Sequence, residues 1–185
     1  MLLEARAASP PALLAVPVGG STDPLAVGTI YPFGSLAYNA DSWGDTLVPV
    51  FVEDEQLMVN LQLDGYCTRT GTPENTVEGY CHFTYAVIDP QSASTIGQLT
   101  AEGPLANPNM VENNPCSALQ VTGGTGFLTA ASGMVQFCPS TLNDVFTPPL
   151  VSSLPSGSDL FEDAEGYEHI LSLLLDQEFA FVAEA

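Results

Sequence analysis

The sequence contains no lysine and only two arginines, Arg6 and Arg69, against 22 acidic residues. The formal net charge is therefore −20, and its long-range field repels both nucleic acid and anionic lipid head groups. We accordingly expect no nucleic-acid partner. Such a charge suits a protein partner with a basic surface, and it equally serves simple solubility, so both interpretations stay open.

Other features are also missing. No stretch approaches the roughly 18–20 consecutive apolar residues of a membrane-spanning helix, so we expect no membrane span. The first 18 residues carry Glu4 early and prolines in the middle, which is not the order of a signal peptide. The Cys-x-x-Cys spacing typical of zinc sites is absent, and we predict neither a metal nor a cofactor.

The four cysteines form two symmetric pairs. Cys67 and Cys81 flank a turn-like sequence, while Cys116 and Cys138 flank the glycine-rich stretch Gly123–Gly126. The members of each pair are an even number of residues apart, so in a symmetric hairpin they point to one face at a spacing that a disulfide can span. We predict the disulfides Cys67–Cys81 and Cys116–Cys138, which would favour an oxidising compartment. Four buried free thiols are the alternative.

Short segments with alternating apolar and polar residues dominate residues 25–138. The clearest are "EQLMVNLQLDGYC" and "VEGYCHFTYAVI", and Gly, Pro and Asn turns separate the segments. This pattern predicts an all-β antiparallel sandwich or barrel. Residues 1–24 are rich in Pro and Ala without a strong period, so we expect an extended N-terminal arm there.

The glycines of "VTGGTGFLTAASGMVQF" raise the possibility of a phosphate-binding loop. Such a loop needs a strand before it and a helix after it, usually with a lysine. Here the following segment alternates like a strand, and no lysine exists. We therefore interpret Gly123–Gly126 as backbone geometry: either a tight hairpin that needs positive φ or a barrel corner with close approach of two chains.

Several motifs between residues 25 and 138, taken in order, resemble the allene oxide cyclase and dirigent barrel superfamily. They are "VGTIYPFGSLAYNAD", "GYC", "GYCHFTYAVID", "GQLTAEGP" and "VTGGTGFLTAASGMVQF". The resemblance implies an eight-stranded antiparallel barrel with a hydrophobic cavity. It gives these candidate cavity residues: Cys67, Phe83, Tyr85, Pro32 and Phe33.

Catalysis does not carry over with the resemblance. The cyclases use a glutamate and an asparagine on their first strand, and residues 1–24 contain Glu4 but no Glu-x-Asn pattern. Cys67 matches a pocket cysteine of the cyclases, but a bridge to Cys81 would remove its thiol. We therefore favour a protein that is not an enzyme.

The C-terminal tail, residues 139–185, begins with a proline-rich stretch and ends in a segment with apolar residues at helical spacing. We predict a helix over residues 164–179 that docks onto a partner. The predicted docking contacts are Phe161, Tyr167, Ile170, Leu171, Leu174, Leu175 and Phe179. The alternative is that this helix plugs one end of its own barrel.

These features together predict a non-catalytic accessory or scaffold subunit that docks to a larger complex with a basic surface. The superfamily resemblance suggests a photosynthetic membrane complex and a plastid or thylakoid periphery as the setting. The alternative is a cyclase- or dirigent-type enzyme, or a lipid binder, with a hydrophobic small molecule in the barrel cavity.

Overall fold

The computed structural model describes residues 1–9, 16–21, 26–42, 45–71, 77–106, 116–140 and 166–175. This part of the chain is all-β. Its strands are β1 (Leu2–Ser9), β2 (Ile30–Leu36), β3 (Tyr38–Asn39), β4 (Leu47–Val52), β5 (Glu55–Arg69), β6 (Val77–Ile88), β7 (Thr95–Ala106), β8 (Ser117–Gly126), β9 (Ser132–Ser140) and β10 (Gly166–Leu174). No helix of the described residues is long and apolar enough to cross a membrane.

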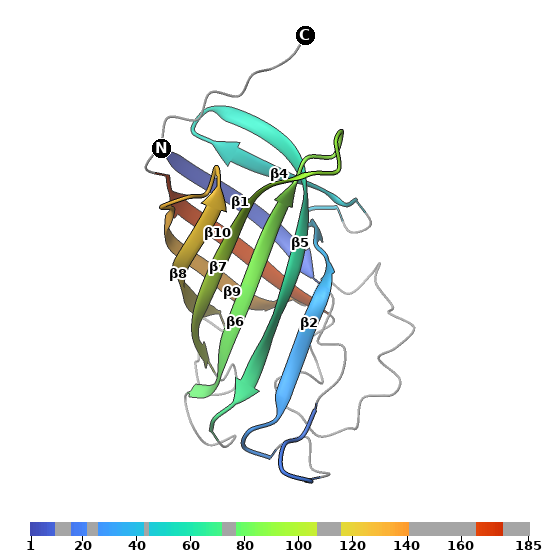
Figure 1. The fold of residues 1–185 in the computed structure, drawn as a ribbon, viewed down its shortest axis with the longest axis vertical. Helices are drawn as coiled ribbons and strands as arrows, with labels where there is room; N and C mark the ends of the chain where they lie inside the picture. The colour runs from blue at the N-terminus through green and yellow to red at the C-terminus, as the bar shows by residue number, and fades with distance from the viewer. Residues whose placement is uncertain are drawn as a thin grey trace.

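Eight strands close into an antiparallel barrel (Figure 1). β4 to β10 pair in chain order, and β1 closes the ring by pairing with β10 on one edge and β4 on the other. β2 and β4 share one edge of β5: β4 pairs with residues 55–60 and β2 with residues 62–68. The short β3 adds a further pairing to β1. The predicted eight-stranded barrel is confirmed.

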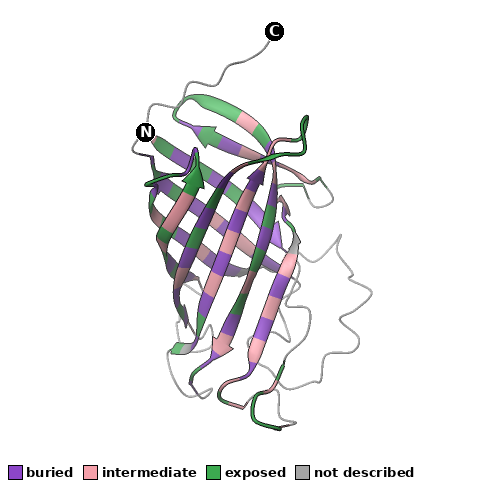
Figure 2. Cartoon of the chain, viewed as in Figure 1, coloured by how far each residue is buried: buried purple, intermediate pink, exposed green. Residues whose placement is uncertain are grey.

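Strict alternation along the strands separates the interior from the outer surface. In β5, Val59, Leu61, Leu63 and Cys67 are buried, and the residues between them are exposed or half-buried. Figure 2 shows this alternation as bands across the strands. Because successive side chains of a strand point to opposite faces, the sequence pattern alone fixes which side chains fill the barrel.

The barrel is larger than the 25–138 predicted from the sequence, since both ends of the chain contribute a strand. Leu2–Ser9 was expected in an arm, and it instead pairs with β10 along its whole length, from Leu2 opposite Leu174 to Ser9 opposite Tyr167. The helix predicted over residues 164–179 is wrong where the structure describes it, because Gly166–Leu174 is strand β10. The apolar residues of this segment fit the spacing of a helix as well as that of a strand. Pairing with β1 on one edge and β9 on the other satisfies the strand's backbone hydrogen bonds.

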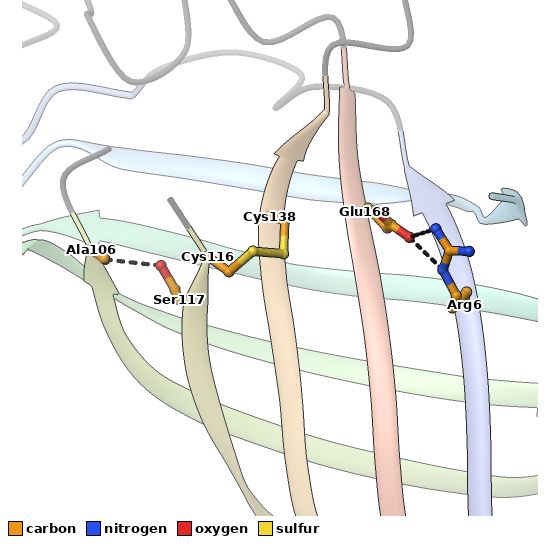
Figure 3. Close-up of a disulfide and its surroundings, with 6 residues drawn as sticks. All are labelled: Arg6, Ala106, Cys116, Ser117, Cys138 and Glu168. Carbon is orange, nitrogen blue, oxygen red and sulfur yellow. Dashed lines mark hydrogen bonds and ion pairs between the residues drawn. A yellow bond between two sulfur atoms is a disulfide. The ribbon is translucent and has the colours of Figure 1, made fainter. Parts of the chain in front are cut away.

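Both predicted disulfides are present, so the prediction of hairpin-opposed cysteines is confirmed. Cys67 and Cys81 lie directly opposite each other on β5 and β6, with a Cα–Cα distance of 4.0 Å. Cys116 precedes β8 and is bridged to Cys138 of β9, at a Cα–Cα distance of 4.1 Å (Figure 3). Cys67 therefore has no free thiol.

The glycine-rich stretch provides close approach of two backbones. Gly123–Gly126 lies within strand β8, and the turn follows it at residues 127–130. A Cβ at Gly124 would meet the Leu128 carbonyl oxygen at 2.0 Å, and Gly126 has a φ of 61°. Both features named in the interpretation from the sequence are therefore present: close approach of two backbones at Gly124, and a positive φ at Gly126, directly before the hairpin turn.

Candidate functional site

The barrel interior has two ends that differ in chemistry. At the turn end, described turns join β4 to β5, β6 to β7 and β8 to β9, and the inward side chains are mostly aliphatic. At the loop end, β1, β5, β7 and β9 finish beside segments outside the described residues: 10–15, 72–76, 107–115 and 141–165. Aromatic and polar side chains collect there, which makes the loop end the candidate site.

An aromatic cluster lies at the loop end. Phe137 of β9 stacks on Tyr167 of β10 with ring centroids 4.4 Å apart, and Phe33 of β2 meets both rings edge-on at 5.8 and 5.6 Å. Phe83 of β6 completes the cluster, 5.3 Å from Phe33 and 5.1 Å from Phe137. Four strands that are distant in sequence thus build one apolar surface whose rings are held in edge-to-face and stacked contacts.

A buried hydrogen-bonded chain crosses this cluster. His169 of β10 lies between two hydroxyls: its Nε2 is 2.9 Å from Ser9 Oγ, and its Nδ1 is 2.9 Å from the Tyr85 hydroxyl. His169 is fully buried, Ser9 and Tyr85 are nearly so, and the imidazole also contacts the Phe83 and Phe137 rings. The Ser9–His169–Tyr85 chain is therefore a linear polar element in an apolar interior.

Burial keeps this chain electrically neutral. Desolvation lowers the pKa of His169 from 6.5 to about 3, so the imidazole is uncharged at physiological pH. Desolvation also raises the pKa of Tyr85, which therefore keeps its proton. A neutral imidazole donates from one nitrogen and accepts at the other, so one of the two flanking hydroxyls donates to it and the other accepts from it. The accepting hydroxyl keeps its own hydrogen, so either end of the chain can present a donor to a bound molecule.

The structure brings most of the predicted cavity residues together. Cys67, Phe83, Tyr85 and Phe33 all face the interior and are buried. Pro32 does not, because alternation along β2 places it on the opposite face from Phe33, where it is half-buried. The prediction for Pro32 is therefore wrong.

The predicted docking residues divide between the two faces of β10. Three are buried in the barrel core: Tyr167, Leu171 and Leu175. Leu174 is 60% exposed on the outer face, and Ile170 is half-buried there. Phe161 and Phe179 lie outside the described residues. A continuous docking stripe on a helix is thus replaced by an inner and an outer face of one strand.

Sequence reasoning missed Ser9, Phe137 and His169 as members of one site. The alternation was available as a signal, since Tyr167, His169, Leu171 and Leu173 follow a period of two. No three His, Cys, Asp or Glu side chains in the described parts of the chain are grouped so that they could hold a metal ion.

Comparisons with known proteins bear on the fold. No family model matches the sequence, and no curated protein matches it. Among solved structures, the chain is similar to the pterocarpan synthase dirigent protein PsPTS1, with a TM-score of 0.50 and 16% identity over 96% of each chain. It is also similar to the pterocarpan synthase dirigent protein GePTS1, with a TM-score of 0.48 and 16% identity over 94% of this chain and 86% of that one.

The fold and its PsPTS1 likeness define a dirigent-like β-barrel. At 16% identity the likeness concerns architecture alone, and the dirigent part of the sequence resemblance is supported at that level.

Proposed function

We propose that the protein binds an apolar small molecule inside the loop end of its barrel and steers that molecule's reaction, in the manner of a dirigent- or cyclase-type protein. The observation that carries the proposal is the Ser9–His169–Tyr85 chain embedded in the aromatic cluster. A predominantly apolar surface with a few placed polar groups is the usual composition of a small-molecule site. The likeness to pterocarpan synthase dirigent proteins points the same way at the level of the fold.

The polar chain has a direct role in this proposal. A hydroxyl or carbonyl group on the ligand would hydrogen-bond to whichever end of the chain presents a free donor or lone pair. Because neutral imidazole exchanges donor and acceptor roles by a tautomer shift, the free O–H donor can lie at either flanking hydroxyl. Ser9, His169 and Tyr85 would then orient the ligand through hydrogen bonds. The chain would stay neutral in a proton transfer only by taking up a proton at one end as it releases one at the other.

The test uses the neutral fluorescent probe N-phenyl-1-naphthylamine and two matched variants of the full chain. Phe137→Ala removes a ring from the loop end, and Leu173→Ala removes a buried side chain from the turn end. We expect the probe to bind, Phe137→Ala to weaken binding by about tenfold through lost apolar contact, and Leu173→Ala to leave it nearly unchanged. Absence of binding, or an equal effect of both variants, would contradict the proposal.

A second proposal keeps the accessory-subunit function expected from the sequence, because the outer face of β10, β1 and β4 carries an amphipathic groove. The groove has a volume of about 270 Å³, and its apolar lining includes Pro49, Phe51 and Ile170. Its charged lining residues are Glu4, Asp41 and Arg6, and Arg6 pairs with Asp41. A basic partner that inserts one apolar side chain would match both its shape and the net charge of −20.

The second proposal has its own measurement. Phe51→Ser should release the protein from a high-molecular-weight assembly on sedimentation of a native extract, and raised salt should do the same. Binding of N-phenyl-1-naphthylamine should not change in this variant. A chain that sediments at its own mass in the native extract would leave only the first proposal.

A further inference from the structure

One of the two arginines is buried at the loop end. Arg69, the last residue of β5, shares the inward face with Cys67 and is 4% exposed. Thr29 lies across from it, since the Arg69 N–H donates to the Thr29 carbonyl at 2.8 Å and the Gly28 N–H donates to the Arg69 carbonyl at 2.7 Å. Thr29 has the same parity as Tyr31 and is fully buried. Two polar side chains thus stand side by side on the interior face.

Neither side chain has, among the described residues, the partner that its chemistry requires. Arg69 Nε donates to the Gly71 carbonyl at 3.2 Å, a neutral acceptor. Within the described residues, no carboxylate pairs with Arg69, and its Nη1 and Nη2 make no hydrogen bond. Thr29 Oγ1 is the one buried side-chain oxygen or nitrogen of the described residues without a partner. Buried polar groups are normally satisfied, and a buried charge is normally paired, so this pair is an exception that calls for a ligand.

The other arginine, Arg6, differs from Arg69 in both exposure and pairing. Arg6 lies on the outer face with a side chain that is 54% exposed, and it pairs with Asp41. It also pairs with Glu168, as Figure 3 shows. In a chain with 22 acidic residues, the exposed arginine has two carboxylates and the buried one has none among the described residues. Burial without a counter-ion is costly, whereas a guanidinium in water needs no partner at all.

We propose that Arg69 and Thr29 form a carboxylate-binding subsite of the barrel interior. This inference rests on the proposed small-molecule function and narrows its ligand to an apolar organic acid. The planar guanidinium fork offers parallel N–H donors that match a carboxylate, and the Thr29 hydroxyl adds a third donor. A free inorganic anion is disfavoured by the net charge of −20, so the carboxylate must be attached to an apolar body that gains free energy from the aromatic cluster.

The test compares two ligands with the same naphthalene body and different end groups: 1-naphthaleneacetic acid, which is a carboxylate at neutral pH, and its uncharged amide, 1-naphthaleneacetamide. Each displaces N-phenyl-1-naphthylamine from the full chain, which gives both affinities. We expect the wild-type protein to prefer the acid by roughly tenfold or more, the scale of hydrogen bonds to a charged group. Arg69→Gln should abolish this preference while the affinity for the amide stays the same, and Thr29→Val should reduce it in part.

The chain supplies a matched control. Arg6→Gln removes the same unit of positive charge from the outer face, and it should keep the preference for the acid in full. If Arg69→Gln does not fold, Arg69→Lys serves instead: it keeps the charge, loses the fork and should retain only part of the preference.

The outcomes distinguish a failure of the carboxylate subsite from a failure of the proposed small-molecule function. If the fluorescent probe and the amide bind but the wild-type protein does not prefer the acid, the subsite is wrong and the proposed function stands. The subsite is also wrong if Arg69→Gln keeps the preference or Arg6→Gln loses as much of it. If neither the probe nor either naphthalene compound binds, the proposed function fails and this inference fails with it.

Discussion

The two ends of the barrel interior show how one fold separates stability from function. The turn end packs aliphatic side chains such as Val48, Leu61 and Leu173, all at most 1% exposed. The loop end packs rings around His169 and also contains Arg69 and Thr29. Among the residues that the structure describes, Arg69 has no carboxylate partner and the Thr29 hydroxyl has no hydrogen-bond partner. Aliphatic packing needs no hydrogen-bond partners, whereas each polar group at the loop end must be satisfied or costs free energy.

The covalent cross-links follow the same division. Both disulfides lie at the loop end: Cys67–Cys81 joins the end of β5 to the start of β6, and Cys116–Cys138 joins the start of β8 to the end of β9. We infer that the disulfides stabilise the loop end, whose interior contains buried polar groups, and that aliphatic packing stabilises the turn end.

The largest expected effect comes from the aliphatic core. Leu61→Ala should lower the free energy of unfolding by about 2–5 kcal/mol, because the turn end loses buried contacts and gains a cavity. Tyr85→Phe, which deletes one hydroxyl from the polar chain, should cost about 1–3 kcal/mol. Urea unfolding of both variants checks the order, and a larger loss in Tyr85→Phe would reverse the roles assigned to the two ends.

Removing one disulfide should loosen the loop end selectively. The bridge Cys67–Cys81 spans a sequence separation of 14, and the double variant Cys67→Ala/Cys81→Ala should lose about 3 kcal/mol. Hydrogen exchange should accelerate near the end of β5 and the start of β6 more than near the turn that joins β4 to β5. Uniform acceleration would argue against separate ends, and four alkylatable thiols in the unreduced protein would argue against the bridges.

Acid should weaken the fold through His169. The pKa of His169 is about 3 in the folded protein, below the usual 6.5. Between these pH values, the imidazole is protonated in the unfolded chain and neutral in the folded chain. Stability contributed by the neutral imidazole is therefore present above pH 6.5 and is lost as pH falls toward 3, by up to about 1.4 kcal/mol per pH unit.

Two histidine variants isolate this effect from the titration of the many carboxylates. Between pH 3 and 6.5, the free energy of unfolding of His169→Gln should fall less steeply with falling pH than that of the wild-type protein. His82→Gln, on the outer face where His82 pairs with Glu102 at 2.8 Å, should keep the wild-type slope. Parallel pH curves for wild type and His169→Gln would show that His169 is not buried as described.

The smallest expected effect concerns the unpartnered hydroxyl. Thr29→Val should leave the free energy of unfolding unchanged or raise it by up to about 1 kcal/mol, since it removes a buried oxygen that has no partner within the described part of the chain. Ser9→Ala should instead lower it by about 1–3 kcal/mol, because it leaves His169 Nε2 without its partner. A destabilisation by Thr29→Val as large as that by Ser9→Ala would show that the Thr29 hydroxyl is satisfied.

Local patterns in the sequence were sufficient for the inward faces of β5 and β6 and for the disulfides. The alternation within residues 56–69 and 77–88 identifies the inward faces of β5 and β6, and the same parity identifies the opposed cysteines. These features depend on neighbours within one hairpin, where register follows from the turn.

The candidate site depends on contacts that no local pattern encodes. Ser9 and His169 are 160 residues apart, and they meet only because β1 and β10 close the barrel. The apolar residues of β10 fit a helix as well as a strand, and pairing with β9 and β1 decides between the two. Pro32 was misplaced for a simpler reason, since neighbouring residues of a strand cannot share a face.

Whether the loop end binds a small molecule can be measured by a two-dimensional NMR titration of the 185-residue chain with N-phenyl-1-naphthylamine. We expect shifts and intermolecular contacts at the Phe137, Tyr167 and His169 rings of the loop end. Little change is expected at the methyl groups of Leu61 and Leu173 at the turn end. Shifts confined to the turn end or to the outer face, with the His169 ring unaffected, would contradict the claim that the loop end of the barrel is a small-molecule site.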